Sequence, residues 1–139
     1  VKISTPSIYK QAVQLEHNRL INAKVIKDRQ MRAKSVYSLT DAGEKEFERL
    51  MFEIASKPIH IFLDFNAVIV NLDSRPPEKQ NVCLTDIEDN IQTLKTYLKD
   101  NLQVKENLPE IPMTGLAVLK QQLVLAEAIE AWIASLKQN

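Results

Sequence analysis

Glycine and cysteine are both scarce in this 139-residue chain, and each scarcity excludes a class of protein. With only two glycines, the chain cannot supply a glycine-rich loop for binding nucleotide phosphates. Its single cysteine, Cys83, excludes an intrachain disulfide framework and suits a reducing compartment. We therefore expect a cytoplasmic protein that relies on its apolar core for stability.

Long apolar runs and clustered metal ligands are missing as well. No stretch approaches 18 uninterrupted apolar residues and no signal-peptide pattern occurs, so we expect no association with a membrane. The two histidines, His17 and His60, are far apart and lack a second ligand at the spacing that zinc requires. Cys83 has apolar neighbours, which predicts a buried thiol rather than a nucleophile. We expect no metal, no cofactor and no enzymatic activity.

Charge is balanced overall but divided unevenly along the chain. The first 40 residues contain eight basic and two acidic side chains, whereas the remainder contains ten basic and sixteen acidic ones. The net charge is thus +6 on the first part and −6 on the second. A basic head on an acidic body indicates that only the head meets a polyanion such as DNA.

The segment from Thr5 to Asn18 has the pattern of an amphipathic helix. Ser4 or Thr5 can cap it, and Pro6 fits its first turn. Ile8, Ala12 and Leu15 recur at helical spacing and predict a buried face. The opposite face holds polar and basic side chains and no carboxylate: Ser7, Lys10, Gln11, Gln14 and Asn18. Such side chains can donate hydrogen bonds to phosphates and to base edges, although a solvated surface would give the same pattern.

A basic hairpin and a second helix follow. Apolar and polar residues alternate from 21 to 25, and a return strand lies at 36–39, which predicts two antiparallel strands. The connecting residues, 27–34, contain four basic side chains and only one acid, Asp28. Thr40 is then placed to cap a helix that extends to about Ser56. Helix, basic hairpin and capped helix, in this order, are typical of a winged helix-turn-helix.

The amino-acid sequence of residues 5–47 resembles the PadR family of bacterial transcriptional regulators. The similarity lies in TPSIYKQAVQLEHNRLI and in the later phrase Tyr-x-Leu-Thr-x-x-Gly, formed by Tyr37, Leu39, Thr40 and Gly43. One departure is Arg19, where the family usually has glycine before a Leu-Ile pair. A left-handed residue is needed there to end the helix, and we expect Asn18 to adopt it more readily than Arg19.

The resemblance implies a DNA-binding head with an incomplete start, over residues 1–56. The family has two further helices upstream, so we expect the natural protein to be longer than this sequence. The recognition helix would enter the major groove, with Tyr9 reaching a phosphate and packing its ring on the wing. The wing would contact flanking phosphates or the minor groove. The residues expected to contact DNA are Thr5, Ser7, Tyr9, Lys10, Gln11, Gln14, Arg29, Arg32 and Lys34.

Residues 57–139 are expected to form a helical dimerisation domain. The most apolar segment, 59–73, fits either a strand or a helix; because it is long for a strand, we predict a buried helix. The resemblance implies a helix here that joins the two domains. Two prolines at 76 and 77 end it, and a coiled-coil-like seam then runs from Leu84 to Leu98 in a helix reaching about Gln103. A final helix is predicted from about Met113 to Lys137.

The final helix carries two apolar stripes, and one chain of this size offers few partners for both. A second subunit is the simplest partner, so we expect a homodimer. The residues expected at its interface are Leu116, Val118, Leu119, Leu123, Leu125, Ala128, Trp132 and Ile133. Some PadR-like regulators bind flat aromatic ligands near an interface tryptophan, so the resemblance also suggests such an effector beside Trp132, although a core role for this residue is more common.

The fold class predicted overall is mainly α with a small β-hairpin wing. The predicted function is that of a homodimeric regulator, a repressor that binds double-stranded DNA at an inverted repeat. The alternative is a helical module for dimerisation or for docking another protein, with a wing that does not bind DNA.

Overall fold

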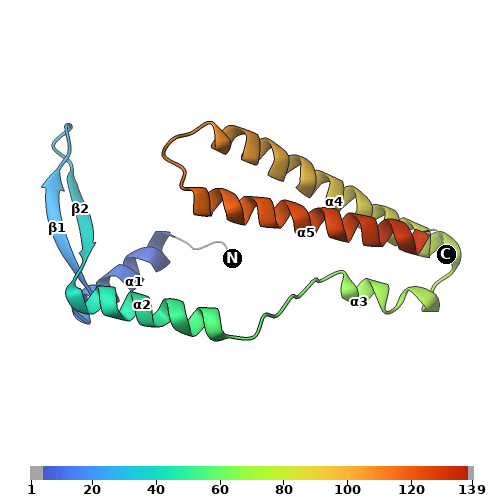
Figure 1. Ribbon diagram of the computed structural model, residues 1–139, viewed down its shortest axis with the longest axis horizontal. Coiled ribbons are helices and arrows are strands. Elements are labelled where there is room, and N and C mark those ends of the chain that lie inside the picture. The colour runs from blue at the N-terminus through green and yellow to red at the C-terminus, as the bar shows by residue number, and fades with distance from the viewer. Residues whose placement is uncertain (1–4, 138–139) are drawn as a thin grey trace. The chain divides into compact units, whose positions relative to one another are not determined.

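The computed structural model describes residues 5–137 and divides into two compact units (Figure 1). The first unit ends at His60 and the second begins at Ile61. The boundary drawn from the sequence was after residue 56, so the structural division falls slightly later in the chain. The two units are described separately below.

The first unit contains helix, hairpin and helix in the predicted order. Its elements are α1 (Thr5–His17), β1 (Ile21–Lys27), β2 (Ala33–Leu39) and α2 (Asp41–Ser56). The strands pair antiparallel, with Ile21 opposite Leu39 and Lys27 opposite Ala33. The predicted hairpin and capped helix are therefore confirmed, and the fold is mainly helical with a β-hairpin wing. The loop between the strands is shorter than expected, because Lys27 and Lys34 lie on the strands.

Thr40 and Gly43 join the end of α1 to the start of α2. The Thr40 hydroxyl donates to the carbonyl oxygens of Arg19 and Leu20, at 2.8 and 3.2 Å, and accepts from the Gly43 backbone N–H at 3.0 Å. The Thr40 backbone N–H also donates to the Leu20 carbonyl, at 3.1 Å. Gly43 is needed because a Cβ at this position would lie 1.9 Å from the Leu20 oxygen. The Thr-x-x-Gly motif thus holds the end of α1 and the start of α2 together at the base of the wing.

The left-handed residue that ends α1 is Arg19, not Asn18 as predicted. Arg19 has a φ of 59°, and the Leu20 N–H returns to the Leu15 carbonyl at 3.0 Å. This backbone closure and the two hydrogen bonds that the Thr40 hydroxyl donates to Arg19 and Leu20 determine that Arg19 adopts the left-handed conformation. They override the local preference of asparagine for this conformation. A side chain at a position suited to glycine carries a steric cost of about 1–2 kcal/mol.

Replacing Arg19 with glycine is therefore expected to stabilise the first unit. The Arg19→Gly change relieves the left-handed strain but adds freedom to the unfolded chain, for a net gain of about 1 kcal/mol in the free energy of unfolding. Chemical denaturation measures the change. Arg19→Ala is the matched control, since it removes the side chain beyond Cβ and keeps the strain; equal stability of the two variants would contradict this explanation.

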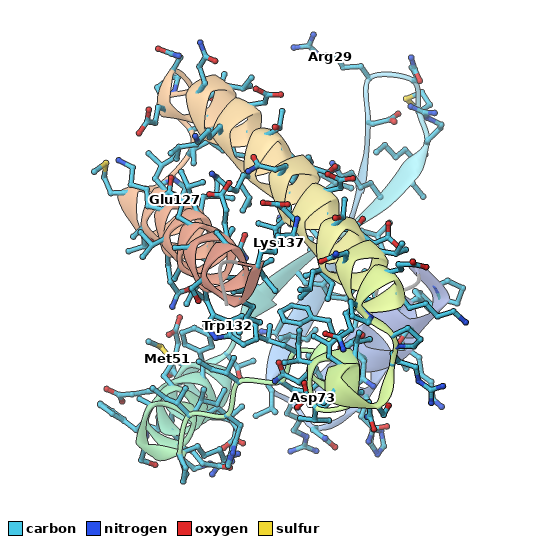
Figure 2. The ribbon with its side chains drawn as sticks, turned by 90° about the vertical axis from the view of Figure 1, so that its right-hand side faces the viewer. Arg29, Met51, Asp73, Glu127, Trp132 and Lys137 are labelled. Atoms are coloured by element: carbon cyan, nitrogen blue, oxygen red, sulfur yellow. The ribbon has the colours of Figure 1, made fainter. Side chains whose placement is uncertain are left out.

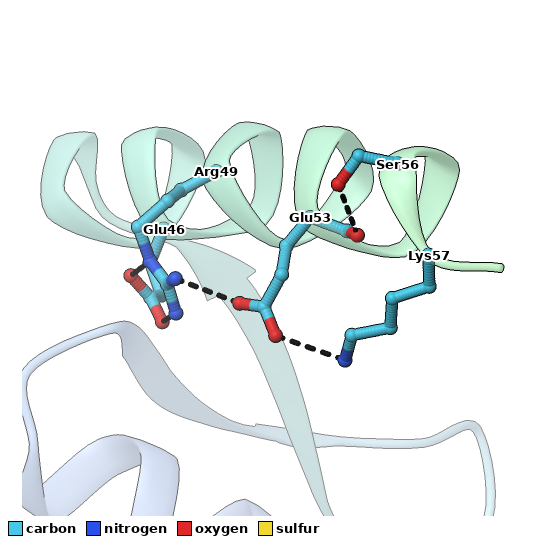
Figure 3. Close-up of polar contacts among 5 residues, drawn as sticks. All are labelled: Glu46, Arg49, Glu53, Ser56 and Lys57. Carbon is cyan, nitrogen blue, oxygen red and sulfur yellow. Dashed lines mark hydrogen bonds and ion pairs between the residues drawn. The ribbon is translucent and has the colours of Figure 1, made fainter.

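Helix α2 carries a ladder of ion pairs along one side (Figure 3). Arg49 contacts Glu46 at 2.7 Å and Glu53 at 2.9 Å, and Lys57 contacts Glu53 at 2.9 Å. The hydrogen bond from Arg49 lowers the pKa of Glu46, while Lys57 first and then Arg49 lower the pKa of Glu53. Pairs three and four residues apart are neighbours on a helix, so the ladder supports α2 at its exposed surface.

The apolar side of α2 is exposed. Phe47 is 55% exposed and Ile54 is 66% exposed, with Leu50 beside them at 40%. These residues share one face, as the sequence predicted. Within the part of the chain that the structure describes, this face is left open to solvent.

The second unit is a pair of long antiparallel helices preceded by short turns. Its elements are α3 (Asn66–Ile69), the 3₁₀ turn η1 (Leu72–Ser74), α4 (Pro77–Glu106) and α5 (Met113–Lys137). The predicted bounds of α5 are confirmed, whereas α4 extends to Glu106, beyond the end predicted near Gln103. The core of the pair contains six buried apolar side chains: Leu84, Ile91, Leu98, Leu116, Ala126 and Ile133. Cys83, expected to be buried, is half-buried.

Ion pairs at the edges of the helix pair match its antiparallel register. Lys95 binds Glu130, Lys137 binds Glu88, and Lys120 binds Glu106 at 2.9 Å. Each pair joins α4 or its end to α5, and the partners run in opposite order along the two helices. Charge pairing therefore agrees with the apolar seams about how the helices align.

The buried helix predicted for residues 59–73 is wrong. Residues 57–63 have no helix or strand, and Ile59 is 91% exposed and Phe62 is 86% exposed. Pro58 disfavours a helical conformation at Lys57, whose ψ is 145°, and the β-branched isoleucines that follow are poor helix formers. Only α3 and η1 form, and the start of α3 has no side-chain cap. No continuous helix therefore joins the two units.

Candidate nucleic-acid interface

The polar side of α1 forms a continuous exposed surface. At roughly 100° per residue, Ser7, Lys10, Gln11 and Gln14 fall within an arc of about 100°. All four residues are exposed, and the only carboxylate of the helix, Glu16, lies on the other side. The side chain of Thr5 and the predicted cap at Ser4 lie outside the described residues. This surface offers hydrogen-bond donors and one cation without a charge that would repel phosphate.

Tyr9 does not lie on this surface. It is two residues from Ser7, about 160° away around the helix, and it is 68% exposed. The predicted packing of its ring against the wing is therefore wrong. The predicted burial of the Ile8 face is also not met within the described residues, since Ile8 is 56% and Leu15 is 39% exposed. Both apolar side chains project from α1 into solvent.

The register of the wing sorts its lysines onto two faces. Lys24 pairs with Val36 and Lys34 pairs with Ile26, so Lys24 and Lys34 project from the same face. Lys27 lies on the opposite face. Lys24 was not among the predicted DNA contacts. The alternation of the strand shows that it shares a face with Lys34 only once the pairing of the two strands is known. We add Lys24 to the candidate interface beside Lys34.

The loop at the tip of the wing is built around Asp28. Its carboxylate accepts from the backbone N–H groups of Gln30 and Arg32, both at 2.9 Å, and from Nε of Arg32 at 3.0 Å. These bonds, led by the one from the Arg32 backbone, lower the pKa of Asp28. The bonds are therefore kept at neutral pH and are lost only as the pH falls through that lowered pKa.

Two arginines are displayed by this loop. Arg29 extends away from the tip (Figure 2). The Arg32 side chain is oriented by Asp28 yet stays 73% exposed. Both are exposed cations, as are the lysines of the two strands.

Replacing either arginine with alanine is expected to weaken binding to all duplex sequences about equally. Contacts to phosphate carry no sequence information, and each lost contact reduces the slope of log affinity against log salt by roughly 1. A titration at several salt concentrations measures this slope for Arg29→Ala and Arg32→Ala. Lys45→Ala, on exposed α2, is the control and should leave it unchanged. Unchanged slopes in both arginine variants would remove the wing from the interface.

The second stripe of α5 is exposed in the second unit. Val118 is 53%, Leu125 is 45% and Trp132 is 40% exposed, and Ala128 is exposed beside them. Of the other residues predicted at a dimer interface, Leu116 and Ile133 are buried within this chain and Leu119 and Leu123 are half-buried. Leu116 and Ile133 are enclosed within this chain, whereas Leu119 and Leu123 are partly exposed, and their place at a dimer interface stays a prediction. The stripe available to a partner is Val118, Leu125, Ala128 and Trp132.

An apolar groove of about 500 Å³ lies next to this stripe. It is lined by the following residues: Ile61, Leu63, Leu94, Leu98, Gln122, Leu125, Ala126, Ala128 and Ile129. Trp132 lies outside the groove and stacks on Phe65, with ring centroids 6.3 Å apart. Among the described residues, no cluster of His, Cys, Asp or Glu is arranged to hold a metal ion. No helix in the described part is long and apolar enough to cross a membrane.

Comparison with known proteins gives structural likeness only. The chain matches no family model and no curated protein sequence. It is similar to the structure of Bacillus subtilis PadR in complex with operator DNA, at 19% identity and a TM-score of 0.80, covering 98% of this chain and 78% of that one.

Two further structures are similar. A PadR-like transcriptional regulator from Bacillus cereus is 19% identical with a TM-score of 0.65, covering 96% of this chain and 74% of that one. The Vibrio cholerae virulence activator AphA is 15% identical with a TM-score of 0.62, covering 97% and 76%. The predicted fold is thereby confirmed: this chain has the winged-helix and long-helix architecture of PadR-like structures.

Proposed function

We propose that this protein is a sequence-specific, DNA-binding transcriptional regulator. The observation that carries the proposal is the carboxylate-free polar surface of α1, which is joined to a basic wing through Thr40 and Gly43. Side chains on α1 would read base edges in the major groove, while the wing holds the neighbouring backbone. The fold of operator-bound PadR supports this assignment.

The regulator would act as a homodimer and as a repressor. Val118, Leu125, Ala128 and Trp132 would meet the same stripe of a second copy, because an apolar surface of this kind is unfavourable in water. Two-fold symmetry would then place two heads on an inverted repeat. Repression follows from covering a promoter.

Loss of Lys10 or Gln14 is expected to weaken binding to the operator more than binding to random duplex. Both side chains project from α1 with no packing role, and a lost base contact costs about 1–3 kcal/mol. Mobility-shift titrations of Lys10→Ala and Gln14→Ala against both duplexes measure the difference. If both variants bind the operator as tightly as the wild type, α1 is not the reading helix.

The second candidate is a protein-interaction module that does not bind DNA. The exposed apolar sides of α2 and α5 favour it. Salt separates the two functions, because affinity for duplex DNA falls steeply with salt when phosphates are contacted. Binding to duplex that is absent, or that does not depend on salt, would support the module.

A small aromatic effector would bind in the second unit. The apolar groove beside Leu125 and Ala128 has a volume within the range of ligand sites, and Trp132 and Phe65 lie in the same unit. Quenching of Trp132 fluorescence by a planar aromatic compound, lost in Leu94→Glu, which places a charge in the groove and keeps Trp132 the single tryptophan, would test this site. A titration that quenches both proteins equally would place the compound elsewhere.

A further inference from the structure

The segment that connects the two units is irregular, apolar and exposed. Residues 57–63 form neither helix nor strand. Within the described part of the chain, the backbone N–H groups of residues 59–65 donate no hydrogen bond to a backbone carbonyl. Ile59 is 91%, Ile61 is 71% and Phe62 is 86% exposed. Both the backbone and the side chains of this segment are therefore open to a partner from solution.

These side chains do not fit a simple spacer. Flexible linkers are rich in glycine and serine, whereas residues 59–63 read Ile-His-Ile-Phe-Leu. Large apolar side chains are unfavourable in water, and burial in a core does not offset that cost here. An irregular chain with open backbone groups can pair with a partner as a strand, while pockets of the partner select its side chains. The composition of the segment therefore indicates recognition.

An endopeptidase is the partner whose requirements this segment meets. Proteolytic cleavage concentrates at exposed, irregular chain, because a peptide bond inside a helix or strand is cut only after that element opens. Leu63 is half-buried in the apolar groove, so a local opening of one turn is enough to free the chain on both sides of Phe62. The two compact units on either side need not unfold.

Phe62 is the residue that such an enzyme could select. All eight aromatic residues of the chain lie in its described part, and six of them lie in helices or strands. Phe65 follows the irregular segment, but it is half-buried and its ring stacks on Trp132. Phe62 alone combines an irregular backbone with an exposed aromatic ring. A peptidase with a pocket for aromatic side chains would therefore cut first at this position.

We propose that the peptide bond between Phe62 and Leu63 is a proteolytic processing site, hydrolysed by an endopeptidase whose primary pocket takes an aromatic side chain. Water is the co-reactant. Its oxygen bonds to the Phe62 carbonyl carbon, the C–N bond breaks, and the Leu63 nitrogen takes a proton. The products are a carboxylate at Phe62 and a new amino terminus at Leu63.

The consequence of cleavage rests on the proposed function. Residues 1–62 contain α1 and the basic wing, whereas residues 63–139 contain the exposed stripe of α5. Hydrolysis removes the covalent link between the DNA-reading surface and the residues that would hold the dimer. Each head then binds alone and loses the gain from linkage, so operator affinity should fall by roughly 10²-fold or more. Because hydrolysis is irreversible, it acts as a one-way release from DNA.

The first test is limited digestion of the intact chain with chymotrypsin, a probe with an aromatic-selecting pocket. Mass spectrometry should identify residues 1–62 and 63–139 as the first products. Phe62→Ala should slow the first cut by roughly tenfold or more, because it removes the side chain that fills the pocket. Phe52→Ala is the matched control, since Phe52 is 69% exposed but lies on α2, and it should leave the rate unchanged. First cuts inside helices or strands, or equal rates for the wild type and Phe62→Ala, would overturn the site.

The second test follows the chain in the cells that naturally produce it, with a different epitope tag at each end. A fragment that ends at Phe62 should accumulate from the wild type and be absent from Phe62→Ala. Its absence from the wild type would overturn the processing. An uncleaved chain that binds no duplex DNA would refute the proposed function and leave the cleavage site standing. A cleaved chain that keeps its full operator affinity would instead refute the release from DNA.

Discussion

Changing Leu125 and Trp132 together to aspartate is expected to abolish the dimer and reduce operator affinity by roughly 10²-fold or more. Both residues lie in the exposed stripe of α5, and two carboxylates there would have to be buried against their symmetry mates. A monomer binds one half-site and loses the gain that comes from linking two heads. Sedimentation equilibrium and mobility-shift titration measure the two effects.

The control for this experiment is Val104→Asp. Val104 is 62% exposed and lies on α4, away from the α5 stripe, so the same chemical change should leave the dimer intact. Circular dichroism checks that the double variant stays folded, because Trp132 also stacks on Phe65. A wild type that is monomeric at micromolar concentration would refute the dimer and favour the interaction module.

Replacing Gly43 with alanine is expected to cause the largest loss of stability in the first unit. The added methyl group would lie 1.9 Å from the Leu20 carbonyl oxygen and 3.1 Å from a methyl of Leu39. The near atom is backbone, so α2 must move away, and the bonds between Thr40 and the end of α1 must lengthen. Overpacking of this kind costs about 3 kcal/mol. Denaturant unfolding measures the loss, and affinity for DNA should fall with it.

Gly115→Ala provides the matched control. A Cβ at Gly115 would meet only Pro112 and Ile111, at 3.7 Å or more. Gly115 lies in the first turn of α5, where alanine is the better helix former, so this variant should be unchanged or slightly more stable. If the Gly43 and Gly115 variants were equally stable, α2 could move away from Leu20 without a loss in the free energy of unfolding, which would contradict the prediction.

Local patterns predicted the elements whose signals agree with one another. The bounds of α5 follow from Pro112 before it and from apolar residues at helical spacing along it. The capped start of α2 follows from Thr40, and the hairpin follows from alternation. In each of these cases, backbone preference and apolar spacing indicate the same structure.

The signals conflicted where prediction failed. Segment 59–73 had apolar residues at strand spacing and a length suited to a helix, and Pro58 with its β-branched neighbours left it largely irregular. Arg19 is left-handed because Leu20 must return to Leu15, which its own sequence preference does not reveal. The same holds at the candidate interface: exposure of the α1 surface was predicted, but Lys24 and the Asp28 bonds emerge only from the strand register and loop geometry.

The most direct test of the central claim is selection of binding sites by the intact protein from a random duplex library. A dimeric reader should enrich an inverted repeat whose half-sites are about one DNA turn, or a simple multiple, apart. Binding to the enriched duplex should weaken steeply with salt, and Lys10→Ala should lose the preference for it. A selection that enriches no sequence, with retention of duplex no better than that of an unrelated helical protein, would contradict the proposed function.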